Sequence, residues 1–481
     1  LILEKNKIPG GCVTTFARKG FHFDTTQIIP DVSDLLTYFD IDIPLKKFDG
    51  YYARLFKADI QTKTAQIIPI PSSHKAFEEM LIERYPEDKK SIQRFFQYCL
   101  KMHQELNYLK TEPHLYQIPG ILLHCKRILA TSNLTFHDFL KKFQFKNPEV
   151  LSIIDTFSSF SGLSGDRCAA LLTACAMITT LKGSFRPEKG FIQFPIALAK
   201  KIKESGIEIR TDCEVQKIIT NNNQIEGVYL KTGEFITSEF VICTADTKVT
   251  YEKLLGLDVL KKANLGFYKK LSKVKMSPSG FSIQLGLDDQ INLSDFGFNC
   301  GYNVLTSGPD AFEKMFKAWE NNDLIQSDSC FHMAAICPSL LTGRKNTLVI
   351  HVVPVPAKYW IELKERNPEE YVKKKNDVAL FYINKIEEYM IPELTKHILV
   401  TDISTPATYK NFIGTPTGSQ YDMLPVPQNF GKNRIKTRTP IKGLFVPKFS
   451  HGIWPSMQAG LQVVDMISKG RIMNGNSSYR R

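Results

Sequence analysis

An acidic residue and two adjacent glycines lie close together at the beginning of the 481-residue chain. Glu4 ends an apolar run that starts at Leu1, and Gly10 and Gly11 follow shortly after it. In dinucleotide-binding folds, an acid at a strand end accepts hydrogen bonds from the ribose hydroxyls of adenosine. Glycine lets the backbone approach a phosphate or a flavin closely, because it has no side chain. Together these residues indicate a bound dinucleotide, whereas Glu4 alone would be an ordinary charge at a strand end.

A second group of polar residues precedes the last predicted helix. Pro455 suits the first helical position, and the free N–H groups of a helix start stabilise negative charge on a nearby group. Lys448 would add to this effect, although it is equally well explained as a solvated loop lysine. For Trp454 the alternative is a core or rim aromatic, and for His451 it is a structural histidine.

Strands and helices alternate around these residues. The run 1–4 predicts a buried strand, and 196–204 predicts a helix followed by a strand at 207–209. An antiparallel meander follows at 214–220, 225–230 and 235–243. Near the end of the chain, a strand at 443–446 precedes the helix that begins near Pro455 and ends by Gly470.

The remainder of the chain carries helical periodicity at 75–109 and 152–181, strand patterns at 276–356 and a helix at 368–398. The most apolar stretch, 168–181, is too short to span a membrane and predicts a buried helix. No G-x-G occurs among the 28 glycines. Either the fold is of another kind, or the first strand and phosphate loop precede residue 1. We favour the second alternative, because the chain starts in mid-strand without Met.

Composition narrows the classes of partner. The ten cysteines form no C-x-x-C pair, which favours reduced thiols, a cytoplasmic location, and Cys12, Cys168 and Cys175 as small buried hydrophobic residues. The net charge of +13 is spread along the chain without a dense basic block. This pattern argues against nucleic acid and leaves peripheral contact with an anionic membrane surface, or simple solubility, as its meaning.

Several motifs, in the same order along the chain, resemble the phytoene desaturase, carotenoid isomerase and retinol saturase family of FAD-dependent oxidoreductases, which is related to the amine oxidases. The motifs are Glu4-Lys5-Asn6, Pro9-Gly10-Gly11, Gly20-Phe21-His22-Phe23-Asp24, Gly190-Phe191, Glu214-Val215-Gln216-Lys217-Ile218, the stretch from Val241 to Asp246, Ser404-Thr405-Pro406-Ala407-Thr408-Tyr409 and Gly418.

The resemblance implies that the chain binds FAD. Glu4 would bind the adenosine ribose, Gly10 and Gly11 would line the flavin side, and Val215 would hold the adenine edge through its backbone. Where the family usually has Gly-Asp, this chain has Phe449, which puts tight FAD binding in doubt. No metal site and no catalytic residue is identified. The cofactor-binding set predicted in this way is Glu4, Lys5, Gly10, Gly11, Val215, Thr244, Ala245, Lys448, Phe449, Ser450, Gly452, Trp454 and Met457.

The expected fold class is α/β, with a Rossmann-like FAD-binding domain that lacks its first strand and phosphate loop, and an inserted α+β substrate domain. The FAD domain would comprise 1–30, 184–270 and 430–481, and the substrate domain 31–183 and 271–429.

The resemblance implies desaturation, saturation or isomerisation of a long apolar polyene such as a carotenoid. The alternatives are a degenerate relative with a lipid-binding or interaction role, and an amine oxidase, which would need an aromatic cage that Trp454 alone does not establish. Phenylalanines are candidate walls of a substrate tunnel, although such residues more often form core. They are Phe136, Phe139, Phe143, Phe145, Phe157, Phe160, Phe281, Phe296 and Phe298.

Overall fold

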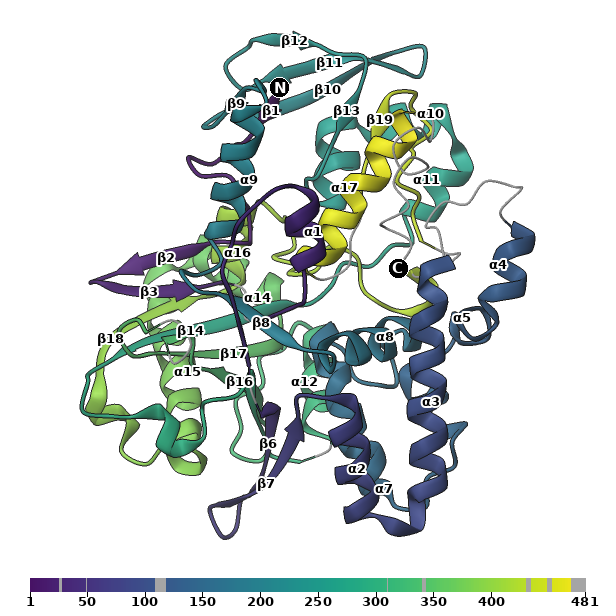
Figure 1. Ribbon diagram of the computed structural model, residues 1–481. Coiled ribbons are helices and arrows are strands. Elements are labelled where there is room, and N and C mark those ends of the chain that lie inside the picture. The colour runs from purple at the N-terminus through teal and green to yellow at the C-terminus, as the bar shows by residue number, and fades with distance from the viewer. Residues whose placement is uncertain are drawn as a thin grey trace.

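The computed structural model describes residues 1–25, 28–48, 50–108, 118–308, 310–339, 343–429, 434–447 and 452–468, except for the side chains of Phe160 and Trp454. A seven-stranded mixed sheet is the largest element of the fold (Figure 1). β15 and β6 are parallel, and the other neighbouring strands are antiparallel. The strand order is β18 (Ile398–Ser404), β14 (Ser279–Leu287), β17 (Thr347–Val355), β16 (His332–Ile336), β15 (Tyr302–Thr306), β6 (Tyr51–Asp59) and β7 (Thr64–Pro71).

Two helices, α14 (Ala357–Arg366) and α15 (Pro368–Tyr389), cover one face of this sheet, whereas α12 (Ala311–Glu320) contributes Met315 to the same cluster and packs Phe312 against His332. Trp360 of α14 and Ile386 of α15 belong to the same buried cluster as Phe281, Ile283 and Leu285 of β14. Alternate residues of a strand point to opposite faces, so the residues between them face away from these helices. The strands predicted for 276–356 are confirmed, with α12 between β15 and β16, whereas the helix predicted to reach residue 398 ends at Tyr389.

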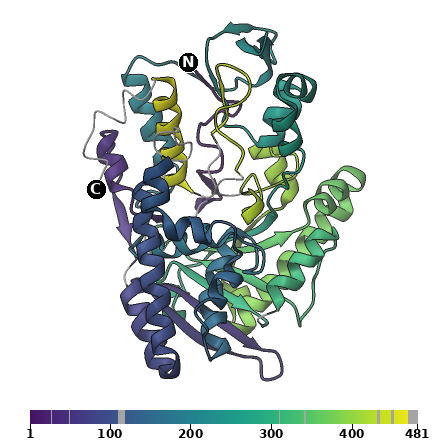
Figure 2. The same ribbon diagram turned by 90° about the vertical axis from the view of Figure 1, so that its right-hand side faces the viewer.

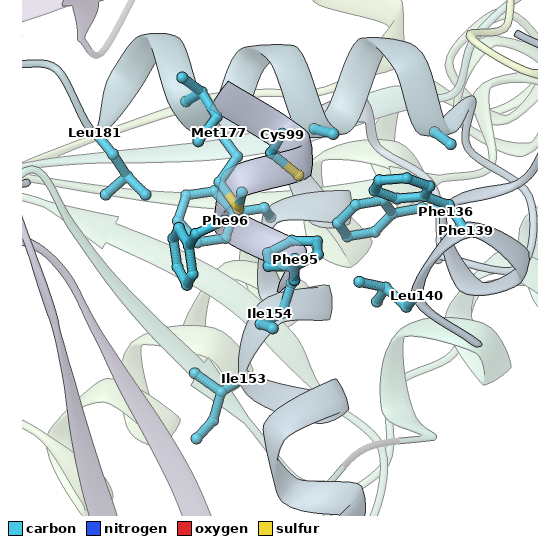
Figure 3. Packing of buried hydrophobic residues seen from close by; sticks show 14 of the residues in the cluster. Phe95, Phe96, Cys99, Phe136, Phe139, Leu140, Ile153, Ile154, Met177 and Leu181 are labelled. Atoms are coloured by element: carbon cyan, nitrogen blue, oxygen red, sulfur yellow. The ribbon is translucent and has the colours of Figure 1, made fainter. Parts of the chain in front are cut away.

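A layer of helices packs around an aromatic core (Figure 3). Phe95 and Phe96 of α3 (Lys89–Glu105) meet Phe139 of α6 (Phe136–Lys141), and the Phe95 and Phe139 ring centroids lie 6.1 Å apart. The candidate tunnel walls Phe136, Phe139, Phe143 and Phe157 are buried in this core, and Phe281 and Phe298 are buried under the sheet; Phe145 and Phe296 are partly buried against the same two cores.

Two predicted helices are each divided in the structure. Residues 75–109 contain α2 (His74–Arg84) and α3, because Pro86 cannot continue a helix and begins a 3₁₀ turn, Pro86–Asp88. Residues 152–181 contain the end of α7 (Pro148–Asp155) and the buried helix α8 (Ala170–Thr180), separated by a turn at Gly162, whose φ is 68°. The prediction of a buried helix in 168–181 is confirmed.

Above the large sheet in both views lie short parallel pairs and a meander (Figures 1 and 2). β1 (Ile2–Leu3) pairs with β9 (Ile209–Arg210), and β13 (Val241–Ile242) with β19 (Leu444–Phe445). The meander comprises β10 (Val215–Asn221), β11 (Gln224–Leu230) and β12 (Phe235–Thr237). The single strand predicted for 235–243 is therefore two strands with different partners.

The first strand differs from its prediction in one respect. Leu1 is 53% exposed and Ile2 is 40% exposed, so the expected burial of this strand is wrong. The reason is that β1 has one neighbour, β9, among the described strands, and the two parallel pairs belong to separate sheets.

The remaining described elements connect these layers. Among the helices of the described residues, none is long and apolar enough to cross a membrane. The connecting elements are β2 (Thr15–Arg18), β3 (Phe21–Asp24), β4 (Ile29–Pro30), α1 (Ser33–Tyr38), β5 (Leu45–Lys47), α4 (Ile118–His124), α5 (Lys126–Thr131), β8 (Ser184–Pro187), α9 (Gln193–Glu204), a π-helix (Val249–Leu255), α10 (Leu257–Ala263), α11 (Leu265–Leu271), α16 (Pro406–Ile413), α17 (Ile453–Ile467) and 3₁₀ turns at Leu106–Tyr108, Thr156–Ser161, Leu293–Phe296, Leu394–His397 and Pro427–Asn429.

Candidate functional site

Glu4 stands directly after β1, and its backbone is fixed on both sides. Its N–H donates to Arg210 O at 2.9 Å, and its carbonyl accepts from Cys213 N at 2.8 Å. The side-chain Oε1 accepts the N–H of Asn6 at 2.7 Å. The second carboxylate oxygen has no hydrogen bond within the described part of the chain. Glu4 therefore has a fixed backbone and an acceptor oxygen available for a ligand.

The structure brings Glu4 close to two other predicted positions. Leu3, Val215 and Ala245 all pack against one buried cluster that includes Ile218 and Leu444. The residues that end β1 and follow β13 therefore pack against the same cluster, although the two strands belong to separate sheets. Thr244, just before Ala245, is exposed. The predicted adenosine side of the site is therefore a connected region.

Lys5 lies in the same region. Burial lowers its pKa, while the nearby carboxylates of Glu4 and Glu214 oppose that shift. Glu214 directly precedes Val215, so Lys5 lies between the first strand and the beginning of the meander. The Lys5 ammonium group therefore lies, partly buried, near Glu4, the predicted ribose acceptor.

The two glycines differ in their surroundings. Gly10 has φ of 124°, and a Cβ atom there would lie 2.7 Å from Cγ of Pro195 in α9. Gly11 has φ of 57°, and a Cβ atom there would meet nothing within 4 Å. Gly10 thus packs the loop against α9, and Gly11 presents open backbone that a ligand could approach.

The C-terminal part of the predicted site is only partly described. Lys448, Phe449 and Ser450 lie outside the described residues, as does His451, and of Trp454 only the backbone is described. Helix α17 begins at Ile453, two residues before Pro455, and Gly452 precedes it with φ of 110°. Met457 and Val13 pack against a cluster that contains Ile453. The start of α17 therefore lies close to the loop that carries Gly10 and Gly11.

An ion pair fixes the start of α9 beneath this loop. Arg186 Nη2 of β8 lies 2.6 Å from Asp24 Oδ2 of β3, and both side chains are almost fully buried. Asp24 Oδ1 also accepts the N–H of Phe191 at 3.1 Å and the hydroxyl of Thr15. Burial lowers the pKa of Arg186, and the charge of Asp24 opposes this shift. Asp24 therefore joins the β2–β3 hairpin, β8 and the chain entering α9.

The sequence analysis did not identify Asp422, which holds the loop after Ala245. Asp422 Oδ1 accepts Thr247 N at 2.9 Å and Oδ2 accepts the Thr247 hydroxyl at 2.7 Å. Ser419 adds a bond of 3.4 Å to Asp246 Oδ2. The partners are 175 residues apart in the chain, and no local pattern links them.

These features fit a dinucleotide better than a metal. Within the described residues, no group of three His, Cys, Asp or Glu side chains could hold a metal ion. An acid with a free oxygen, an open glycine backbone and a helix start are the groups that bind ribose, pyrophosphate and an anionic ring. The residues present therefore fit the two ends of FAD.

Comparisons with known proteins agree with this fit. The family model for flavin-containing amine oxidoreductases matches residues 1–280. The chain is 26% identical over 475 residues to the chloroplastic prolycopene isomerase of Daucus carota, covering 92% of this chain and 71% of that protein. It is 24% identical over 283 residues to the 4,4'-diaponeurosporene oxygenase of Staphylococcus aureus, covering 58% of this chain and 53% of the oxygenase. An oxidoreductase from Methanosarcina mazei shares the fold, with a TM-score of 0.58 and 15% identity over 96% of this chain and 93% of that one.

Proposed function

Because the chain belongs to the flavin-containing amine oxidoreductases and uses FAD, we propose that it acts on carbon–carbon bonds of a long apolar polyene. The observation that carries the proposal is the similarity to a prolycopene isomerase over 92% of the chain. An oxygenase named for another carotenoid is similar over 58% of it. The reaction would be desaturation, saturation or isomerisation of a carotenoid-like substrate.

The proposal assigns roles to the chain's own residues. Glu4 binds ribose hydroxyls, Val215 holds adenine through its backbone, and Gly11 lets the cofactor approach the loop closely. The start of α17 would bind the flavin end, and Lys448, Phe449 and Ser450, which lie outside the described residues, are proposed from the sequence to act there too. Bound FAD supplies two-electron redox chemistry, so the protein needs few acids or bases of its own.

The proposal also divides the chain into two functional parts. Residues 1–30, 184–270 and 430–481 would bind FAD, and residues 31–183 and 271–429 would bind the apolar substrate. The parallel pairs and the meander belong to the first part. All strands of the seven-stranded sheet belong to the second part.

A third part of the proposal is peripheral contact with an anionic membrane surface, from which an apolar substrate would enter. Helix α4 supports it, because its residues Leu122 and Leu123 are 58% and 62% exposed. Figure 1 shows α4 at the edge of the molecule.

The test uses the full chain purified with FAD. We expect a yellow protein with flavin absorbance bands that, under argon, converts phytoene, prolycopene or a retinoid, with products separated by chromatography. The FAD is supplied in oxidised and in reduced form, because desaturation reduces one flavin per product and saturation oxidises one. Conversion of amines without conversion of any polyene would instead support the amine oxidase alternative. A protein that binds FAD and converts neither class would support the degenerate alternative, and one that cannot bind FAD would contradict the proposal.

A further inference from the structure

Asp422 contacts two parts of the molecule through different atoms. Its carboxylate oxygens accept the N–H and the hydroxyl of Thr247 at 2.9 Å and 2.7 Å. Its backbone carbonyl accepts the N–H of Ser277 at 2.7 Å. Thr247 ends the loop of residues 244–247 after β13, which we call the β13 loop, whereas Ser277 lies two residues before β14 of the large sheet (Figure 1). Asp422 therefore joins the proposed FAD part to the proposed substrate part.

The β13 loop is fixed at both ends and open near its start. Cys243, directly before it, donates its N–H to a carbonyl of β19 at 2.9 Å. At the other end, Thr247 is 1% exposed and is held by Asp422. Thr244, a predicted cofactor-binding residue, is exposed. Asp422 thus holds the buried end of a short loop whose open end is available to FAD.

The chain on the other side of Asp422 is also well fixed. Residues 420–424 run antiparallel to residues 275–278, the chain that enters β14. Backbone N–H groups of the first segment donate to the second at 2.8, 2.9 and 3.2 Å. Ser277 is 3% exposed, so the chain at this point is buried. A displacement of Asp422 therefore also moves the chain that enters β14.

The backbone conformation of Asp422 allows its side chain to be tested separately. Its φ is 60°, which lies in the left-handed region. Aspartate and asparagine adopt this conformation more readily than other residues that carry a side chain, and glycine adopts it freely. Substitution by Asn or Gly therefore keeps the backbone and changes only the hydrogen bonds of the side chain.

We propose that Asp422 is a positioning residue that couples FAD binding at the β13 loop to the chain that enters the seven-stranded sheet. The inference rests on the proposed function and on the prediction that Thr244 and Ala245 contact FAD. A cofactor that contacts a loop must order it, and Asp422 lowers that cost by holding Thr247 in advance. Coupling between two sites is reciprocal, so FAD at the β13 loop in turn stabilises the contacts of Asp422. Bound FAD thereby orders the entry of β14 as well.

The first measurement is the affinity of the full-chain apoprotein for FAD, by fluorescence titration. Asp422→Gly removes both acceptor oxygens and should weaken FAD binding about tenfold, because the cofactor must then order the β13 loop itself. Asp422→Asn should lose less affinity, since an amide can still accept the Thr247 N–H and donate to its hydroxyl oxygen. Thr247→Ser keeps both donors and should match the wild type, whereas Thr247→Val should lose part of the affinity.

Asp88→Asn is the matched control. Asp88 is a buried carboxylate of the helical layer, and its oxygens accept the N–H groups of Lys146 and Asn147 at 2.7 Å and 2.8 Å. This substitution should lower the free energy of unfolding but leave the FAD affinity unchanged. If it weakens FAD binding as much as Asp422→Gly does, general destabilisation explains the loss, and the inference is wrong.

The second measurement is hydrogen exchange, followed by mass spectrometry with and without saturating FAD. In the wild type, FAD should slow exchange several-fold in peptides that cover Val215 and also in those that cover 275–279. In Asp422→Gly with saturating FAD, the slowing at Val215 should remain, and the slowing at 275–279 should be lost. A residue that only stabilises the fold would change the exchange rates without changing their dependence on FAD.

These outcomes separate the two proposals. If FAD slows exchange at Val215 but not at 275–279 in the wild type, or if Asp422→Gly retains the full FAD affinity, the inference is wrong while the proposed function stands. If the wild-type protein does not bind FAD, the proposed function fails as well. The comparison within the wild-type protein decides the question even if a variant does not fold.

Discussion

Glu4 offers a direct test of cofactor binding at the scale of one residue. Its free carboxylate oxygen is the proposed acceptor for ribose, and hydrogen bonds to charged groups contribute about 1.5–3 kcal/mol. Glu4→Gln should therefore weaken FAD binding by roughly ten- to a hundredfold, measured by titrating the apoprotein with FAD. Glu226→Gln, at an exposed position of β11, is the matched control. Equal affinities for wild type and Glu4→Gln would remove Glu4 from the site.

Only residues whose signal is local could be proposed for the site from the sequence. Glu4 and Gly11 could be chosen because a strand end and a glycine pair are readable within a few positions. Asp422 could not, because it meets Thr247 only through the tertiary fold. Cys168 and Cys175 are buried as expected from their residue type, whereas Cys12 is exposed.

At the scale of elements, His137 joins α6 to the chain around it. Its Nε2 lies 3.1 Å from Asp155 Oδ2 at the end of α7, and its Nδ1 lies 2.7 Å from Asp166 Oδ1. The hydrogen bond to Asp155 contributes most to raising the pKa of His137 to about 9, Asp166 adds to it, and burial opposes it. Only a protonated imidazole can donate to both carboxylates. The charge therefore holds α6, α7 and the chain before α8 together.

The raised pKa predicts how stability depends on pH. The unfolded pKa of histidine is about 6.5, so the stabilisation is complete below that pH and is lost as pH rises through about 9. His137→Gln should lower the free energy of unfolding by about 1–2 kcal/mol at pH 6, after allowance for solvent screening, and by much less at pH 10. Denaturant unfolding at both pH values measures this, with His22→Gln as an exposed control. A loss that is equal at both pH values would mean that packing, and not charge, is responsible.

Element boundaries show where periodicity fails as a guide. Helix α9 was predicted well because its apolar face and its ending at Gly206 are local signals. The break between α7 and α8 was not, because Phe157 and Leu163 in the intervening turn pack into the same core as the helices and preserve the apolar pattern. β12 and β13 were read as one strand because only their partners, β11 and β19, distinguish them.

At the scale of the whole molecule, the net charge of +13 predicted attraction to an anionic surface but not the place of contact. The structure supplies a candidate, because Leu122, Leu123 and Leu129 are exposed on α4 and α5. Residues 118–134 contain no Asp or Glu, and Lys126 among them is exposed, whereas Arg127 pairs with Glu105 at 2.9 Å. An apolar helix beside an exposed basic residue suits a protein that inserts shallowly into anionic membranes.

Vesicle flotation tests this contact. The protein should float with vesicles of phosphatidylserine and phosphatidylcholine more than with phosphatidylcholine alone, and less at high salt, because a lysine near an anionic surface contributes about 1 kcal/mol. Replacing both Leu122 and Leu123 by Ser should reduce vesicle affinity at least about tenfold, since burying a leucine side chain contributes about 1.5–3 kcal/mol. Leu380→Ser on α15, where the side chain is 54% exposed, is the matched control. If the control loses as much affinity as the double variant, or if neither changes, α4 does not carry the contact, and the apolar substrate must reach the protein by another surface.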